Sequence, residues 1–440
     1  MERTLVVDTP KRIGQIVRLA GWVHVRRDHG KIIFVDLRDR TGIVQTVIIP
    51  DDQALYALAE TLGNEYVIDI EGLVKERPAS AVKDENQIGS VEVEVRHIAV
   101  LGVTKGDLPL NIAGDDASLH LDTLLDHRVL ALRNEKTKAI FRLYAEVIRA
   151  YSAILRHEGF TEIKSPKILS NATEGDANFF KIQYFEREAF LAQSPQFYKQ
   201  AGVGVFERVF EVGSVFRAEP HVTTRHINEY IGMDAEFGFI QGLSDVMDQL
   251  EQTMAYVFTQ VRKRCPHDLK LYKASAPHVK HIPRMKLAEA RVILEREYGK
   301  KSESLDIDPE GERLLGEWVR KYHKSDLLFL THYPTKARPF YAMPSPENPE
   351  ETESFDLLFR GVEIATGGQH IHDYDQLVAS MQRHGLDPDD FVHYLDIFKY
   401  GMPPHGGWGL GSERVVQQLL GLKSIQEAVL FPRDIKRLTP

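Results

Sequence analysis

Two segments far apart in the sequence each place arginine among residues suited to binding a polyanion. The first holds Arg217, Arg225 and His226, and the second, the glycine-rich run 409–414, ends on Arg414. A guanidinium is planar, stays charged at any working pH and binds phosphate through two parallel hydrogen bonds. Arginines from separate segments can therefore hold a bent triphosphate. Two surface arginines in ordinary ion pairs are the alternative interpretation.

Hydrophobic patterns indicate which elements position these arginines. Residues 208–216 are rich in strand-forming side chains, the polar run 220–224 interrupts them, and residues 230–237 resume the pattern. This order predicts a β-hairpin. Apolar residues recur at helical spacing after Arg414, so we expect this arginine at the start of an amphipathic helix, where anions are favoured.

A pair of carboxylates forms a second candidate site. Asp356 and Glu363 lie in a strand, turn, strand pattern over residues 354–364. Two carboxylates on adjacent strands can hold Mg²⁺ through one or two oxygens each and leave other positions to water and phosphate. An acid pair that faces lysine or arginine is the alternative.

Composition bounds the class of protein. The chain has 440 residues, of which 43% are hydrophobic, enough for two or three domains with a buried core. The single Cys265 excludes an intrachain disulfide framework and a cysteine-rich zinc site. The N-terminus lacks an apolar secretory core, and no uncharged apolar run approaches the ~20 residues of a membrane span. We therefore expect a globular, cytoplasmic enzyme.

Short strand-like runs separated by turns make up the N-terminal part. These runs are 17–25, 32–37, 43–49, 66–74 and 91–100. Five strands with little helix between them predict a small barrel of the OB-fold type, which binds oligonucleotides. The net charge of the chain is −9, but residues 1–50 carry nine basic and five acidic side chains. Phe34 beside arginines suggests a stacking platform for bases, and a place in the barrel core is the alternative.

The remaining chain divides into a connector and a larger domain. Residues 105–134 are polar and contain Gly and Pro, which predicts a hinge. Apolar residues then repeat at helical spacing over 135–158, which predicts a long amphipathic helix. We expect a barrel domain over 1–104, a linker over 105–134 and a second domain over 135–440.

At the two arginine segments the chain resembles the class II aminoacyl-tRNA synthetases, specifically the aspartyl-tRNA synthetases of the archaeal and eukaryotic type. Phe-Arg-Ala-Glu at 216–219, followed by Thr-Arg-His, looks like motif 2, and Gly-Leu-Gly-Ser-Glu-Arg at 409–414 looks like motif 3. The proline-ended run 159–166 looks like motif 1, which builds the dimer interface of the class. The resemblance covers nearly the whole chain. It implies an α+β fold, with a five-stranded OB-fold barrel and a catalytic domain of antiparallel sheet flanked by helices, in a homodimer.

The resemblance also implies a role for each matching residue. ATP would be bound by Arg217, Glu219, Arg225, His226, Tyr230, Glu363, Gly411 and Arg414. L-Aspartate would be bound by Glu174, Gln196, Lys199, Arg217 and His370. Asp356 and Glu363 would hold Mg²⁺, and Arg217 and Arg414 would be catalytic because they neutralise charge on the phosphates.

Lys199 and His370 concern the identity of the amino acid. Lys199 ends the run 193–199, which is typical of the aspartate enzymes, and a buried carboxylate substrate requires a positive partner. His370 departs from the family pattern Gly-Gly-Gln-Arg-x-His, in which the arginine contacts the side-chain carboxylate of the substrate. Histidine is shorter and titratable. A zinc site built on His370 and His372 is not favoured, because metal-type spacing is absent nearby.

The departure at His370 keeps other functions open. One is a paralogue with altered amino-acid specificity, and another is an RNA-binding paralogue without charging activity. An amide ligase that uses the adenylate without tRNA is a third, although the N-terminal barrel argues against it.

In the resembling family the barrel binds the tRNA anticodon. The matching residues are His24, Arg27, His29, Phe34 and Gln45. His24 stands where enzymes specific for tRNA(Asp) tend to carry Trp, and where enzymes that also charge tRNA(Asn) tend to carry His. The resemblance therefore implies tRNA(Asp) as a partner, and His24 adds tRNA(Asn).

Overall fold

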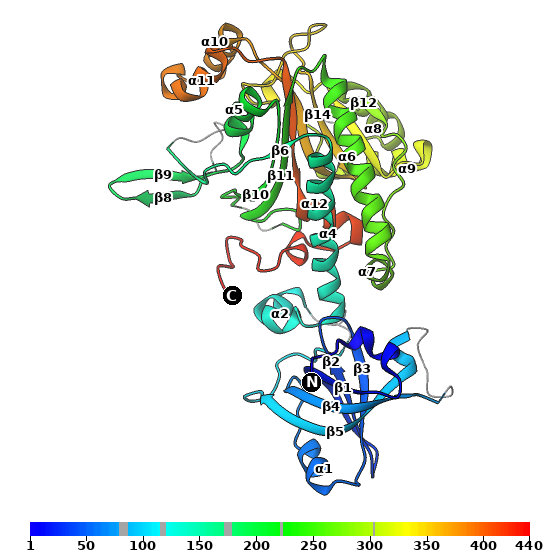
Figure 1. Ribbon diagram of the computed structural model, residues 1–440. Coiled ribbons are helices and arrows are strands. Elements are labelled where there is room, and N and C mark those ends of the chain that lie inside the picture. The colour runs from blue at the N-terminus through cyan, green and yellow to red at the C-terminus, as the bar shows by residue number, and fades with distance from the viewer. Residues whose placement is uncertain (79–86, 115–119, 171–177, 221–222, 302–303) are drawn as a thin grey trace. The chain divides into compact units, whose positions relative to one another are not determined.

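The computed structural model in Figure 1 describes residues 1–78, 87–114, 120–170, 178–220, 223–301 and 304–440. They form two compact units, Met1–Asn134 and Glu135–Pro440. None of the described helices combines the length and the apolar character that crossing a membrane requires.

Five strands close into a barrel in the first unit, as predicted, in the order β1-β2-β3-β5-β4. They are β1 Ile16–Asp28, β2 Ile33–Arg38, β3 Ile43–Ile48, β4 Val67–Glu76 and β5 Val91–Gly102. Side chains such as Val17, Leu19 and Val23 alternate into a buried apolar core. The helical segments of this unit, which the sequence did not predict, are η1 Val6–Arg12, α1 Gln53–Glu60, η3 Gln87–Ser90, α2 Leu121–Asp126 and α3 Arg128–Ala131. The last two lie in the region expected to be a polar hinge.

A central sheet of eight strands organises the second unit, in the order β12-β13-β14-β15-β16-β11-β10-β6. These strands are β12 Arg284–Lys286, β13 Leu327–Thr331, β14 Ser354–Phe359, β15 Val362–His370, β16 His405–Gly411, β11 Glu229–Gly238, β10 Arg208–Phe216 and β6 Thr161–Glu162. The inner pairings are antiparallel, as expected, and the outermost pairing at each edge is parallel.

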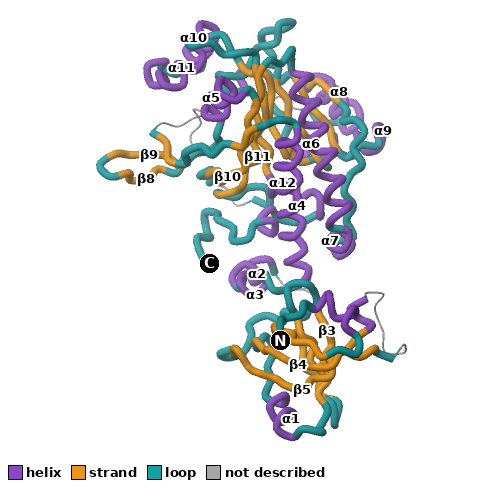
Figure 2. Tube along the Cα trace, viewed as in Figure 1, coloured by secondary structure: helices purple, strands orange, loops and turns teal. Residues whose placement is uncertain are grey.

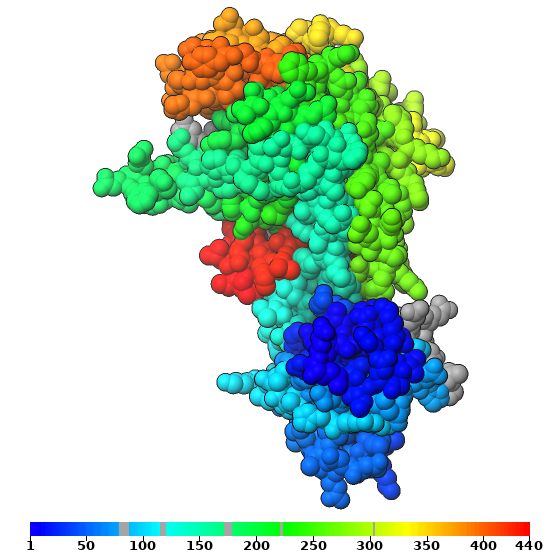
Figure 3. Space-filling model, viewed as in Figure 1, coloured from blue at the N-terminus to red at the C-terminus, as the bar shows by residue number. Residues whose placement is uncertain are grey.

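A small second sheet orders β7 Ile168–Leu169, β9 Arg187–Leu191 and β8 Lys181–Tyr184. The hairpin of β8 and β9 projects from the body of the second unit (Figures 1 and 3).

Helices flank the central sheet, as expected (Figure 2). They are α4 Glu135–His157, α5 Gln196–Phe206, α6 Leu243–Arg264, α7 Pro266–Leu271, α8 Leu287–Tyr298, α9 Pro309–His323, α10 Tyr374–Arg383, α11 Val392–Lys399 and α12 Ser412–Leu420, with short 3-10 turns η5 Thr335–Ala337, η6 Pro388–Phe391 and η7 Ile425–Ala428. The long helix predicted over 135–158 is α4. The main apolar core lies between the sheet and helices α4, α6 and α12.

At β11 and β16 the two faces of the sheet have opposite chemical character. On β11, Met233 and Ala235 join the apolar core, while Asp234 and Glu236 between them point to the other face, because strand side chains alternate. On the neighbouring β16, Trp408 enters the same core. At β11 and β16 the face away from α4, α6 and α12 is therefore polar, and a site can form there.

Gly407 of β16 is the tightest point of this polar face. A Cβ atom added there would lie 2.0 Å from the carbonyl oxygen of Ala235 and 2.4 Å from Oε2 of Glu236. Since β16 is hydrogen-bonded on both sides, it cannot move away without breaking a ladder. We expect Gly407→Ala to lower the free energy of unfolding by about 3 kcal/mol, measured by denaturant titration of the full chain. The matched control is Gly242→Ala, whose added Cβ meets nothing within 4 Å; equal losses in the two variants would contradict this explanation.

Candidate active site

A cavity of about 230 Å³ opens on the polar face of the sheet. The residues that the sequence assigned to ATP all line it, namely Arg217, Glu219, Arg225, His226, Tyr230, Glu363, Gly411 and Arg414. Gln196, Lys199 and His370, assigned to aspartate, line the same cavity. Glu174 lies outside the described residues. The structure thus brings together side chains from segments nearly 200 residues apart in one place.

The predicted hairpin positions Arg217. Strands β10 and β11 pair from Arg208 opposite Phe237 to Phe216 opposite Glu229. Arg217 follows directly, and its guanidinium carbon lies 5.8 Å from the centre of the Tyr230 ring. This distance is within the range of a cation–π contact, so the arginine and the ring present a charged and a planar surface side by side in the cavity.

The second arginine segment is also confirmed as strand followed by helix. Arg414 lies in the first turn of α12, and its Nη1 donates to the carbonyl oxygen of Glu363 at 2.9 Å. The Glu363 carboxylate lies 3.5 Å away from the same nitrogen. Arg225 pairs with Glu312 of α9 at 2.7 Å. Burial and then the charge of Glu363 raise the pKa of Glu312 to about 7, although Arg225 opposes the shift.

Asp356 and Glu363 occupy two paired strands, as predicted. Asp356 is opposite Thr366 and Leu358 is opposite Glu363, so both carboxylates point to the polar face. Glu363 lines the cavity. Asp356 is 4% exposed, lies 2.8 Å from Nη2 of Arg338 and accepts a short hydrogen bond from Thr366. Both acids offer the oxygen donors that Mg²⁺ prefers, Glu363 at the cavity wall and Asp356 behind it.

Helix α5 closes the floor of the cavity with Lys199, which is 2% exposed. Its ammonium nitrogen lies 3.2 Å from Oδ1 of Asp234 and 3.6 Å from Oε2 of Glu236. It also donates to the carbonyl oxygen of Trp408 at 3.1 Å. Burial raises the pKa of Asp234, and the charge of Lys199 counteracts part of that shift.

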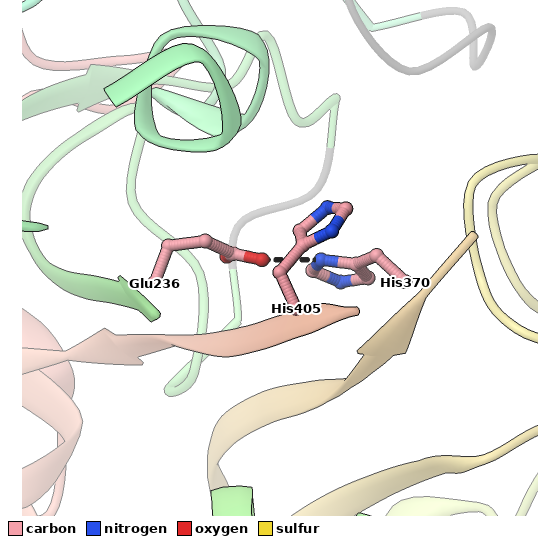
Figure 4. Close-up of side chains that lie close together, drawn as sticks. All are labelled: Glu236, His370 and His405. Atoms are coloured by element: carbon pink, nitrogen blue, oxygen red, sulfur yellow. Dashed lines mark hydrogen bonds and ion pairs between the residues drawn. The ribbon is translucent and has the colours of Figure 1, made fainter. Parts of the chain in front are cut away.

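His370 lies beside this charge network. Its Nδ1 is 2.6 Å from Oε1 of Glu236, and the register of β15 and β16 places it directly opposite His405 (Figure 4). Burial opposes the charged form of Glu236, but His370 and Lys199 outweigh it and lower the pKa of the carboxyl. Burial lowers the pKa of His405 to about 4.

Sequence reasoning missed four residues in or beside this site: Asp234, Glu236 and His405, which are buried, and Arg338, which is half-buried. Asp234 and Glu236 alternate with apolar residues inside the predicted return strand, and that alternation could have assigned them to a polar face. His405 opens the glycine-rich strand, but nothing local indicated its neighbours. Arg338 lies in an irregular segment without periodicity, so no signal was available.

The outer face of the barrel carries the residues assigned to the anticodon. Arg27 lies opposite Phe34 across β1 and β2 and pairs with Asp36 at 2.8 Å. Phe34 is only partly buried and does not belong to the barrel core, so the core alternative is wrong. The His29 ring meets it edge-on at 5.7 Å. Gln45, opposite Asp36 on β3, donates to Glu92 at 3.1 Å.

His24 sits in an irregularity of β1 between Val23 and Val25. Nη1 of Arg38 lies 2.9 Å from its Nδ1. A guanidinium only donates, so Nδ1 is the acceptor. Arg38 is itself held by Glu65 at 2.8 Å, and Arg133 meets the same Glu65 oxygen at 2.9 Å. The buried pair of Arg38 and Glu65 thus fixes the orientation of the His24 ring.

Comparison with known proteins agrees with both units. Residues 120–435 match the family of tRNA synthetases class II (D, K and N), and residues 17–101 match the OB-fold nucleic acid binding domain. The chain therefore belongs to the class II aminoacyl-tRNA synthetases of the D, K and N group, whose substrates are ATP, an amino acid and tRNA, and which use ATP with a divalent metal.

Individual relatives refine this membership. The aspartate–tRNA(Asp/Asn) ligase of Deinococcus radiodurans is 43% identical over 100% of this chain and 99% of its own. The aspartate–tRNA(Asp) ligase of Pyrococcus horikoshii is also 43% identical, over 97% of each chain. The crystal structure of asparaginyl-tRNA synthetase from the same archaeon, complexed with asparaginyl-adenylate, superimposes with a TM-score of 0.90 at 32% identity over 98% of each chain. These similarities do not favour a paralogue with altered amino-acid specificity, an RNA-binding paralogue without charging activity or an amide ligase.

The pairing of Lys199 with two enclosed carboxylates makes its removal costly. Lys199→Met would leave Asp234 and Glu236 buried without their ammonium partner, and breaking a buried ion pair costs about 3 kcal/mol or more. We expect that loss in denaturant unfolding of the full chain. The control is Lys164→Met, an exposed lysine paired with Glu162 at 2.8 Å, for which a loss below about 1 kcal/mol is expected. A Lys199 variant as stable as the control would show that the two carboxylates do not depend on this cation.

Proposed function

We propose that this protein activates L-aspartate with ATP and transfers it to the 3′ end of tRNA(Asp) and tRNA(Asn). One observation carries the proposal: the buried ammonium of Lys199 lies at the floor of a cavity that Arg217 and Arg414 also line. A site that takes an amino acid with a carboxylate side chain needs a cation at that depth. The identity of 43% to aspartate–tRNA ligases over their full length supports the choice of aspartate.

In the first step, the α-carboxylate of aspartate attacks the α-phosphorus of ATP in line, and the bond to pyrophosphate breaks. Arg217 neutralises the charge that develops on the α-phosphate. His226 and Arg414 hold the γ-phosphate, and Tyr230 stacks against adenine. Glu219 meets adenine or the acceptor end of the tRNA. No side chain acts as a nucleophile, so catalysis consists of positioning and electrostatic stabilisation.

Glu363 and Asp356 are the residues that would hold Mg²⁺. Their oxygen donors and their common face suit this ion, and Glu363 reaches the cavity wall. When bound, the ion supplies positive charge to the departing pyrophosphate. Arg414 meets Glu363 at 3.5 Å and so orients that carboxylate toward the phosphates.

In the second step, the terminal ribose hydroxyl of the tRNA attacks the activated carbonyl, and AMP leaves. The barrel, residues 1–104, holds the anticodon with His24, Arg27, His29, Phe34 and Gln45. The segment 105–134 links it to the catalytic domain, 135–440. The support for an RNA-binding face is that Arg27, Phe34 and Gln45 lie on three adjacent strands, with Phe34 opposite Arg27 and Gln45 opposite Asp36, two residues further along β2.

The protein acts as a homodimer in the cytoplasm. Strand β6, within the run that resembles motif 1, is an outermost strand of the central sheet, and an edge strand offers unpaired backbone groups to a second copy. The cytoplasm is the compartment in which ATP and tRNA meet for translation.

The activation step can be tested without tRNA. The wild-type protein is expected to exchange radiolabelled pyrophosphate into ATP in the presence of aspartate. Arg217→Lys, which keeps the charge but loses the planar fork, should lower the exchange rate about 10²- to 10³-fold. Arg313→Lys, an exposed arginine paired with Glu317, is the control and should exchange at the wild-type rate. No exchange by the wild type even at high aspartate would refute the proposed function.

The choice of tRNA can be tested with two transcripts. We expect the wild type to charge both tRNA(Asp) and tRNA(Asn) with aspartate. His24→Trp should lower charging of tRNA(Asn) about tenfold relative to tRNA(Asp), a difference of about 1.4 kcal/mol, because the larger indole cannot keep the contact to Arg38. His97→Trp, an exposed histidine on β5, serves as the control. Charging of tRNA(Asp) alone by the wild type would reject the dual specificity.

A further inference from the structure

Three buried side chains from three adjoining strands converge beside the cavity floor. They are Glu236 of β11, His370 of β15 and His405 of β16, with side-chain ligand atoms all within 4.8 Å of one another (Figure 4). Glu236 and His405 are 0% exposed and His370 is 6% exposed. Across the part of the chain that the structure describes, no other group of three or more His, Cys, Asp or Glu side chains lies this close together.

Glu236 has acceptor capacity that the protein does not use. Its Oε1 meets His370, but its Oε2 has no hydrogen-bond partner among the described residues. The nearest ammonium, that of Lys199, is 3.6 Å from this oxygen and closer to Asp234. A buried acceptor without a partner costs about 1–3 kcal/mol, so the site favours an additional cationic ligand.

The ring of His405 is oriented as in a metal-binding histidine. Its Nδ1 donates to the carbonyl oxygen of Pro403 at 2.9 Å, which leaves the lone pair on Nε2. Such a carbonyl contact typically fixes the tautomer of a metal ligand. The Gln200 amide donates to Nε2 at 2.8 Å, and the carbonyl of the same amide accepts from Tyr394 at 2.9 Å. An ion bound to Nε2 of His405 replaces the hydrogen bond from Gln200 and leaves the hydrogen bond from Tyr394 to Gln200 intact.

The net charge at the cavity floor also differs from that of an enzyme with the family arginine at position 370. Lys199 contributes one positive charge, and Asp234 and Glu236 contribute two negative ones. An arginine at position 370, as in the resembling pattern, brings the sum to zero, whereas the imidazole of His370 carries no fixed positive charge. A divalent ion beside it supplies more than the charge of the missing arginine and favours an anionic substrate side chain.

We propose that Glu236, His370 and His405 bind a divalent transition-metal ion of the Zn²⁺ class, with one coordination position open to the cavity for the side-chain carboxylate of the substrate. Two imidazoles and one carboxylate with an open position are a known ligand set for catalytic Zn²⁺. Ligand bonds of about 2.0–2.2 Å hold tetrahedral ligand atoms about 3.3 Å apart, so the contact between His370 and Glu236 opens by about 0.7 Å. The ion takes the place of the proton in the hydrogen bond between His370 and Glu236.

Metal binding can be measured without substrate. Full-length protein, stripped of metal by dialysis against a chelator, is titrated with Co²⁺ and read by the visible absorption of tetrahedral Co²⁺. We expect one tetrahedral Co²⁺ ion per chain, displaced by Zn²⁺. The isosteric Glu236→Gln should weaken Co²⁺ binding about 100-fold, and His370→Arg should abolish it. His372→Gln removes a nearby imidazole outside the group and should bind like the wild type. Thermal unfolding of each variant verifies that it is folded.

The substrate role rests on the proposed function and has its own readout. Addition of aspartate should change the Co²⁺ spectrum of the wild type. Metal depletion should raise the KM for aspartate at least tenfold in the wild type and leave the KM of His370→Arg unchanged, since arginine supplies the charge directly.

The outcomes separate the two proposals. No tetrahedral Co²⁺ spectrum in the wild type, or an equal spectrum in His370→Arg, overturns the metal site. A spectrum that aspartate leaves unchanged overturns the substrate role of the ion. Charging of tRNA by metal-depleted protein at an unaltered KM would point to a protonated His370 in place of the ion and leaves the proposed function standing. Metal binding without pyrophosphate exchange refutes the function and keeps the site.

Discussion

One enclosed ammonium group sets the geometry of the polar face. Asp234 and Glu236 are buried between β11 and α5, and a carboxylate that leaves water loses several kcal/mol unless a cation meets it. Lys199 meets both, at 3.2 and 3.6 Å. Because Lys199 lies near the start of α5, this end of the helix must lie against β11. The cavity takes its floor from that position, and the depth at which an amino-acid side chain can be bound follows from it.

Glycine on the neighbouring strand makes this packing possible. Asp234 is opposite Gly409 and Glu236 is opposite Gly407 across β11 and β16, so each carboxylate lies over a residue that has no side chain. The intervening Trp408 enters the apolar core on the other face. One short strand therefore serves a tightly packed apolar core on one side and a charged site on the other, because its two faces are built from residues of opposite size.

Sequence patterns predicted the parts of the structure that depend on neighbours along the chain. The β10–β11 hairpin, the helix that begins near Arg414 and the five barrel strands each follow from a local periodicity. The group formed by Glu236, His370 and His405 instead depends on β11, β16 and β15 becoming neighbours in the sheet, and no local pattern encodes pairings over such separations. The contact between Asp356 and Arg338 was hidden because Arg338 lies in an irregular segment without periodicity. His370 was singled out only because it departs from a family pattern.

The contact between Arg38 and His24 has a consequence for what the barrel can read. The arginine occupies the lone pair of Nδ1, so the neutral ring carries its proton on Nε2 and acts there only as a donor. A base that meets this nitrogen must therefore offer a carbonyl oxygen or an unprotonated ring nitrogen, whereas an exocyclic amino group would meet donor with donor. On the anticodon-binding face that we propose, the buried guanidinium of Arg38 would thus limit which edge of a nucleotide His24 can accept.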